Sequence, residues 1–73
     1  MTVEIHSKDA LQPVYVEGDF MEVVNGFNIS QAQGKAFVVL TEAGSGGRPV
    51  AIEAKNVILF REVDRSEDAF IGG

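Results

Sequence analysis

Cysteine is absent from this chain of 73 residues, and His6 is its only histidine. No disulfide can form, and a zinc site would have to be built mainly from carboxylates. Domains of fewer than about 70–80 residues commonly need a disulfide, a metal or a partner chain to supplement one small hydrophobic core. We expect no metal and no cofactor, so association with another chain is the supplement that the composition leaves open.

Basic residues are scarce as well: six Lys and Arg stand against eleven Asp and Glu, for a formal net charge of -5. Binding to nucleic acid needs a concentrated basic face, so we do not expect nucleic acid as a partner. Long apolar runs are also lacking, whereas a membrane span needs about 20 apolar residues in a row. Residues 1–6 have neither the basic region nor the apolar core of a secretory signal. The expectation is a cytoplasmic protein with no membrane partner.

What the sequence does contain is a strong β pattern. Residues 36–41 and 50–54 are apolar runs joined by the glycine-rich segment 42–49, and a third run, residues 57–60, follows almost at once. Apolar runs bounded by turn residues predict strands, and the first two are spaced as a hairpin. In outline, residues 37–62 resemble the small regulatory and phage-encoded β proteins built on SH3-like or similar barrels. That resemblance covers about a third of the chain.

The N-terminal part adds two shorter strand patterns. Residues 2–6 alternate between polar and apolar side chains, which is typical of a half-buried strand, and residues 14–17 form the second pattern. The prediction is therefore a mainly β protein: a small antiparallel barrel or sandwich of five to six strands within a single domain, residues 1–63. Residues 64–73 are expected to form a charged C-terminal tail with an apolar end.

Residues 19–27 are compatible with two structures. Phe20, Val23, Val24 and Phe27 have the spacing of one helix face, and Asp19 is a suitable N-cap, so a short helix near residues 19–25 is one prediction. The other prediction is a strand followed by a tight turn at Asn25 and Gly26, with residues 30–34 as a loop. The pattern slightly favours the strand and hairpin, because a helix of two turns is too short to stand without tertiary packing.

The central strands predict association. Residues 37–40 and 57–60 are apolar at every position instead of alternating, which indicates that both faces of each strand are covered. A domain this small offers little cover of its own, so a second copy is expected to cover one face. The residues expected at the interface are Val39, Leu59, Phe70 and Ile71.

The glycine-rich connection is the candidate for ligand contact. Backbone N–H groups in such a turn can surround an anion, and a neighbouring Arg can pair with phosphate or carboxylate. The residues expected at this site are Gly44, Ser45, Gly46, Gly47 and Arg48. The aromatic residues Tyr15, Phe20, Phe27 and Phe37 are expected in the core.

No catalytic residue is predicted. His6 is expected to be an exposed residue on an edge strand, and no nucleophile is paired with a base. The functional expectation is a non-catalytic, acidic binding or adaptor module of a regulatory or phage-derived kind. It would act as a homo-oligomer or bind another protein. The alternative is a module for a small anionic ligand or nucleotide, with its site at a subunit interface.

Overall fold

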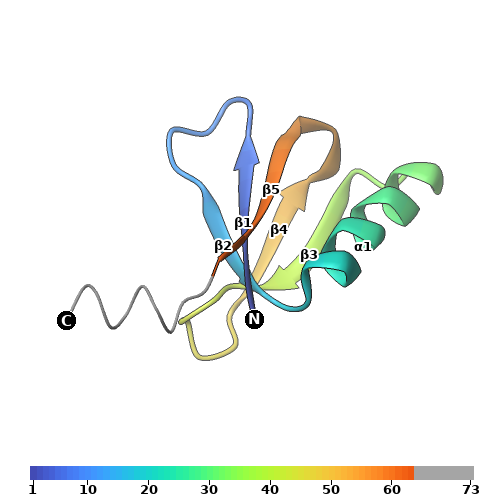
Figure 1. The fold of residues 1–73 in the computed structure, drawn as a ribbon. Coiled ribbons are helices and arrows are strands. Elements are labelled where there is room, and N and C mark those ends of the chain that lie inside the picture. Colours follow the sequence, from blue (N-terminus) through green and yellow to red (C-terminus); the bar gives the residue numbers. More distant parts are fainter. Residues whose placement is uncertain (64–73) are drawn as a thin grey trace.

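The computed structural model of the protein describes residues 1–63 (Figure 1). Within them the protein is mainly β, as the sequence predicts, with five strands in two sheets and one α-helix. The elements in chain order are β1 (Thr2–Ser7), β2 (Val14–Glu17), α1 (Phe20–Ala32), β3 (Phe37–Thr41), β4 (Pro49–Glu53), the 3₁₀ turn η1 (Ala54–Asn56) and β5 (Val57–Val63). The predicted interface residues Phe70 and Ile71 lie outside the described residues.

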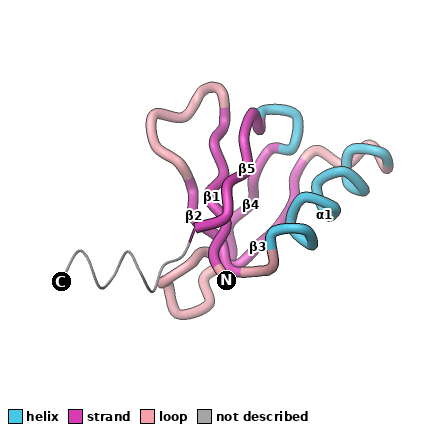
Figure 2. Tube along the Cα trace, in the orientation of Figure 1, coloured by secondary structure: helices cyan, strands magenta, loops and turns pink. Residues whose placement is uncertain are grey.

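β1 is the central strand of a three-stranded sheet, between β2 and β5 (Figure 2). Both pairings are antiparallel, and Thr2 lies opposite Glu17 on one side and Val63 on the other. β3 and β4 form a separate antiparallel hairpin in which Val39 lies opposite Ala51.

One bridge, between Val16 and Glu42, links the two sheets. Beside it, the N–H of Ala43 donates to the carbonyl of Tyr15 at 2.8 Å. Among residues 1–63 the strand pairings do not close into a barrel, since β4 pairs only with β3 and β5 only with β1.

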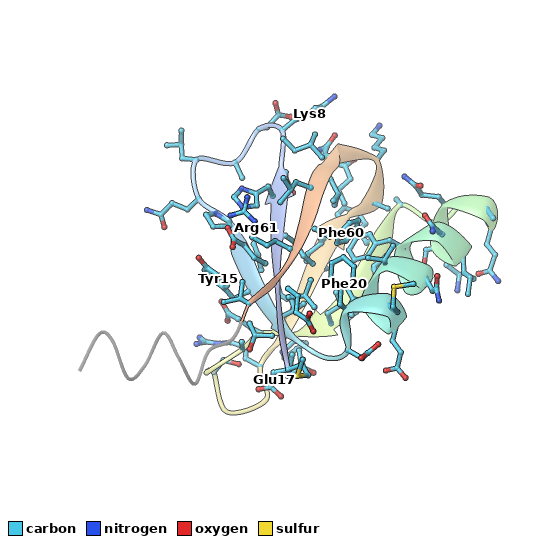
Figure 3. All side chains as sticks on the ribbon, in the orientation of Figure 1. Lys8, Tyr15, Glu17, Phe20, Phe60 and Arg61 are labelled. Carbon is cyan, nitrogen blue, oxygen red and sulfur yellow. The ribbon has the colours of Figure 1, made fainter. Side chains whose placement is uncertain are left out.

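A single hydrophobic core fills the space between the two sheets and α1. The helix side chains Val23 and Phe27 enter it, and the ring of Phe27 meets that of Phe60 edge-on, with centroids 5.1 Å apart. Figure 3 shows Phe60 and Phe20 between the strands and the helix. The buried core residues are Val3, Ile5, Val16, Val23, Phe27, Ile52 and Ala54.

The helix corrects the favoured prediction for residues 19–27. These residues form no strand, Asn25 and Gly26 make no hairpin turn, and α1 continues to Ala32, through most of the predicted loop. The alternative prediction, a short helix near residues 19–25, had the correct element type but only about half of its length. Tertiary packing decides the outcome, because the face that carries Val23 and Phe27 is buried against both sheets.

The start of α1 follows the sequence signal closely. The side chain of Asp19 accepts hydrogen bonds from the backbone N–H groups of Met21 and Glu22, at 3.1 and 3.3 Å, which satisfies two donors that have no partner within the helix. Gly18 before it has a φ of 141°, and a Cβ there would lie 3.2 Å from the side chain of Val23. Glycine therefore lets β2 turn sharply into the helix.

Candidate functional site

The outer surface of the β3–β4 hairpin is apolar. Alternate side chains of β3 and β4 point inward, where Val38, Leu40, Val50 and Ile52 pack against the core. The outward side chains of the same strands include Val39, which is 67% exposed, and Phe37, which is 56% exposed. Pro49 and Ala51, on β4, are exposed beside them. We call the set Phe37, Val39, Pro49 and Ala51 the hairpin face.

The hairpin face accounts for the unbroken apolar sequence of residues 37–40. The two strands do alternate between an inner and an outer face, and nothing within residues 1–63 covers the outer one. The expectation that Phe37 belongs to the core is wrong, whereas Phe27 is buried there and Phe20 packs against it. A ring left in water on a sheet surface forgoes the stabilisation that its burial would give.

Strand β5 carries a second, smaller exposed apolar pair, Ile58 and Leu59. Leu59 lies opposite His6 on the outer surface of the three-stranded sheet. Of the two described residues predicted at an interface, Val39 is therefore on one sheet and Leu59 on the other. Both are exposed strand residues, but they lie on strands that are not neighbours.

Basic side chains border the hairpin face at both ends. Lys35 and Lys55 line one shallow hollow, together with Glu53, where β3 begins and β4 ends. At the other end Arg48 directly precedes Pro49, the first residue of β4. Residues 35–55 contain three bases and two acids, which makes this segment net positive within an acidic chain.

The acids of this segment lie close to its bases. A carboxylate oxygen of Glu53 is 3.8 Å from the Lys55 ammonium, and one of Glu42 is 3.4 Å from Nε of Arg48. The two pairs involve exposed basic groups, and such pairs are individually weak. The cations therefore remain accessible to further anionic groups.

The predicted ligand loop, residues 44–48, is a folded turn with internal hydrogen bonds. Ser45 Oγ donates to the carbonyl of Glu42 at 2.6 Å and accepts from the N–H of Arg48 at 2.9 Å. The residues of this loop with positive φ are Gly44, Gly46 and Gly47. The turn thus uses its serine and the N–H of Arg48 to hold its own shape, and anion binding by it stays a prediction.

An open hollow lies beside this loop, between the ends of β1, β2 and β3. The predicted ligand loop contributes Gly44 to its lining but not Arg48. Glu17 supplies a carboxylate, and no Lys or Arg side chain is among the lining residues. The full lining is Met1, Thr2, Glu17, Gly18, Thr41, Ala43 and Gly44. Of the lining residues, only Met1 carries a cationic group, its terminal ammonium, that an anion could meet.

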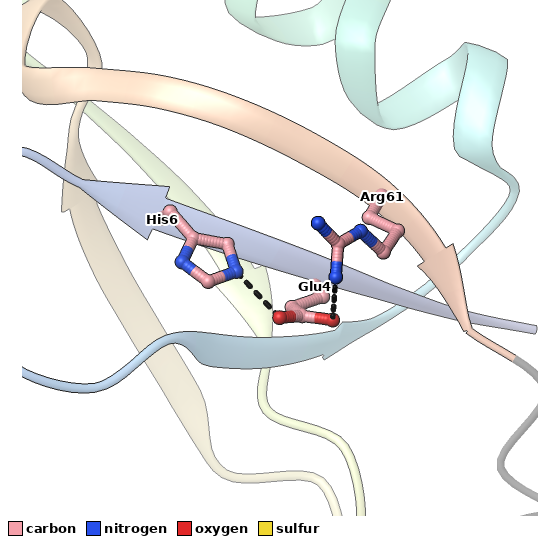
Figure 4. A network of polar contacts seen from close by, with 3 residues as sticks. All are labelled: Glu4, His6 and Arg61. Carbon is pink, nitrogen blue, oxygen red and sulfur yellow. Dashed lines mark hydrogen bonds and ion pairs between the residues drawn. The ribbon is translucent and has the colours of Figure 1, made fainter.

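A polar cluster occupies the outer surface of the three-stranded sheet (Figure 4). The side chain of Glu4 is only 12% exposed; one of its oxygens hydrogen-bonds Nε2 of His6 at 2.5 Å, and the other lies 3.9 Å from Nη1 of Arg61. The description of His6 as an exposed residue on an edge strand is therefore wrong. β1 is the central strand, and its i, i+2 pairing places Glu4 and His6 on the same face.

The contacts of this cluster support a stabilising role. A carboxylate that orients an imidazole is also an arrangement used by hydrolytic enzymes, where the imidazole takes a proton from a nucleophile. Within residues 1–63, no Ser or Thr hydroxyl is hydrogen-bonded to His6. What the cluster provides is an imidazole and a guanidinium as partners for a largely buried carboxylate, which would otherwise be costly to remove from water.

Two further properties of the described residues bear on function. In the described part of the chain, no group of three or more His, Cys, Asp or Glu side chains is placed to hold a metal ion. The longest helix there, α1, has 13 residues, and none of the helices has the length and apolarity needed to cross a bilayer. No family model matches this chain, and no curated protein matches it.

Proposed function

We propose that this chain is a small, acidic, non-catalytic binding module that associates with copies of itself through apolar side chains on the outer surfaces of its strands. The observation that carries the proposal is the hairpin face. Single exposed apolar residues are ordinary on a protein surface. A phenylalanine and a valine two residues apart on one strand, with proline and alanine beside them on the next, form a contiguous surface of the kind that marks interaction sites.

The small size of the domain supports the same proposal. Among residues 1–63, seven make up the buried apolar core, and the chain has no cysteine with which to add a disulfide. A domain of about 60 residues buries only about 60% of the surface that its unfolded chain exposes. Covering Phe37 and Val39 with a second copy would add apolar burial without any change inside the domain.

The test is the mass of the particle in solution, measured by light scattering during size exclusion. We expect the full chain to form an oligomer and Val39→Lys to dissociate it, because a lysine at a covered position would place a charge in an apolar contact. Leu11→Lys is the matched control, since Leu11 is equally apolar and fully exposed, but lies in the connection between β1 and β2. It should leave the mass unchanged.

A monomeric full chain at every concentration would rule the proposal out, and so would equal effects of the two lysine substitutions. Leu59→Lys adds a further comparison. If β5 contributes to the same contact, this variant dissociates the oligomer as Val39→Lys does, and if the hairpin face acts alone it does not.

We also propose that the strands follow one curved, barrel-like order, β5-β1-β2-β3-β4, which stays open between β5 and β4. The bridge at Val16 and Glu42 and the neighbouring hydrogen bond from Ala43 to Tyr15 support this order, because they connect the two sheets through β2. In this arrangement the outer surfaces of both sheets are continuous around the molecule.

A further inference from the structure

We propose that the hairpin face binds the chain's own C-terminal segment, residues 67–71, supplied by a second copy. This inference rests on the proposed self-association and names the part of the partner that makes the contact. In a pair related by a two-fold axis, each copy would place Phe70 and Ile71 on the hairpin face of the other. Three features of the chain support residues 67–71 as the segment that binds there.

The first feature is the size of the hairpin face. A fully covered aromatic side chain buries about 150–250 Å². Phe37 is just over half exposed, so it offers roughly 100 Å², and the smaller side chains of the hairpin face add less each. Four such residues fall well short of the roughly 800 Å² that each partner buries in a stable interface. Two hairpin faces packed on each other would thus need additional apolar groups.

Phe70 and Ile71 are apolar groups of the required kind. They follow the charged residues 64–68 in the sequence, and burial on a partner would give both side chains a stabilisation that water does not. Exchange of this segment would add a large aromatic and an aliphatic side chain at each of two equivalent contacts.

The second feature is charge. The hairpin segment, residues 35–55, is net positive, whereas residues 64–73 contain three acids and one base. Arg48 lies at one end of the hairpin face and Lys35 and Lys55 at the other. An acidic segment therefore finds cations on either side of the apolar surface, while packing one acidic domain directly on another brings like charges together.

The third feature is the position and length of the segment. Val63 pairs with Thr2, and Thr2 lines the same hollow as Thr41. The chain thus leaves β5 at the end of the molecule where the loop between β3 and β4 lies (Figure 1). Seven residues from Val63 to Phe70 span up to about 23 Å when extended, which is enough to leave one domain and cross onto another.

The order of residues matches as well. From this end of the molecule the hairpin offers first Arg48 and then the apolar side chains, and the segment offers first Glu67 and Asp68 and then Phe70 and Ile71. A segment that enters the hairpin face of the second copy from its Arg48 end would place Glu67 and Asp68 beside Arg48. Phe70 and Ile71 would then cover Val39.

The first experiment uses the full chain and the double variant Phe70→Ser/Ile71→Ser. We expect size exclusion with light scattering to give an oligomer for the former and a monomer for the latter, with unchanged circular dichroism. If the double variant keeps the oligomer of the full chain, segment exchange is overturned while self-association stands. If the full chain is itself monomeric, both proposals fall.

A second experiment locates the contact. Because the chain has no cysteine, Ser66→Cys gives a single site for a nitroxide label next to the segment. Chains at natural isotope abundance that carry the nitroxide are mixed with ¹⁵N-labelled wild-type chains. We expect the nitroxide to broaden the amide signals of Val39 and Ala51 in the ¹⁵N-labelled wild-type chains. The same label on Asp9→Cys, in the β1–β2 connection, should not broaden them.

Absence of broadening from Ser66→Cys in the mixture would overturn the exchange. Broadening at these amides only when label and ¹⁵N are in the same chain would do so too, since it would show that the segment returns to its own hairpin.

Discussion

Glu4 is the residue whose environment departs furthest from what its type suggests. A glutamate on the central strand of a sheet, with a side chain 12% exposed, would destabilise the fold if it were alone. His6 on the same strand and Arg61 on β5 supply its partners, and the register that places Arg61 opposite Glu4 is part of the β1–β5 pairing. The cluster therefore favours one register of the sheet.

Neutralising Glu4 without changing its size should weaken the fold. We expect Glu4→Gln to lower the free energy of unfolding by about 1.5–3 kcal/mol, because hydrogen bonds to a charged group are worth about that much. Urea unfolding followed by circular dichroism measures the change. Glu62→Gln, at an exposed position on β5, is the control and should stay within about 0.5 kcal/mol of the wild type. Equal midpoints for Glu4→Gln and the wild type would contradict a stabilising role.

Among the elements, α1 is the one whose sequence signals were present but could not be decided from the sequence alone. Asp19 as N-cap and the spacing of Phe20, Val23 and Phe27 were both visible in the sequence. The sequence could not weigh them against the turn signal of Asn25 and Gly26, because the choice depends on two sheets that bury the helix face. The same limit applies to His6, whose place on a central strand follows from the pairing of β1 with β5, more than fifty residues away.

The strands themselves were more predictable. The strands of the hairpin β3–β4 lie within one residue of the predicted runs, because apolar runs between glycine-rich or polar links specify strands locally. Strand β5 begins at the predicted residue 57 but continues three residues beyond the predicted end, to Val63. Val39 is predicted at an interface because its strand has more apolar residues than one core can cover; its side chain is exposed, and the interface stays a prediction. The side that would face outward required the register with β4.

Gly26 allows the structure of α1 to be tested with a single substitution. It lies in the interior of α1, and a Cβ added there would meet nothing within 4 Å. Gly26→Ala should therefore raise the free energy of unfolding by about 1 kcal/mol, the difference in helix propensity between the two residues.

Gly44→Ala is the matched control for this substitution, because its surroundings are equally open but its φ is +74°. It should lower the free energy of unfolding by about 1 kcal/mol, since a side chain disfavours that backbone conformation. Both values come from urea titration, and a destabilised Gly26→Ala variant would contradict the structure of α1.

At the scale of the whole molecule, self-association would couple stability to concentration. The free energy that stabilises a folded oligomer against unfolded chains rises with protein concentration. For each association step, a tenfold rise in concentration adds about 1.4 kcal/mol. The melting temperature of the full chain should therefore rise by several degrees between micromolar and submillimolar protein. Calorimetry at a series of concentrations measures this. The Val39→Lys variant should melt at one temperature throughout, and a wild type that does the same would argue against association.

The placement of β1 has a consequence for how the protein is made. This strand is hydrogen-bonded on both sides, and its neighbour β5 is the last of the described strands in chain order. During synthesis, β1 must wait for about fifty further residues before its second partner exists. Assembly of the sheet is thus a late, long-range event, and contacts between distant parts of a chain slow folding. During that interval Val3 and Ile5 remain open to water and to other nascent chains.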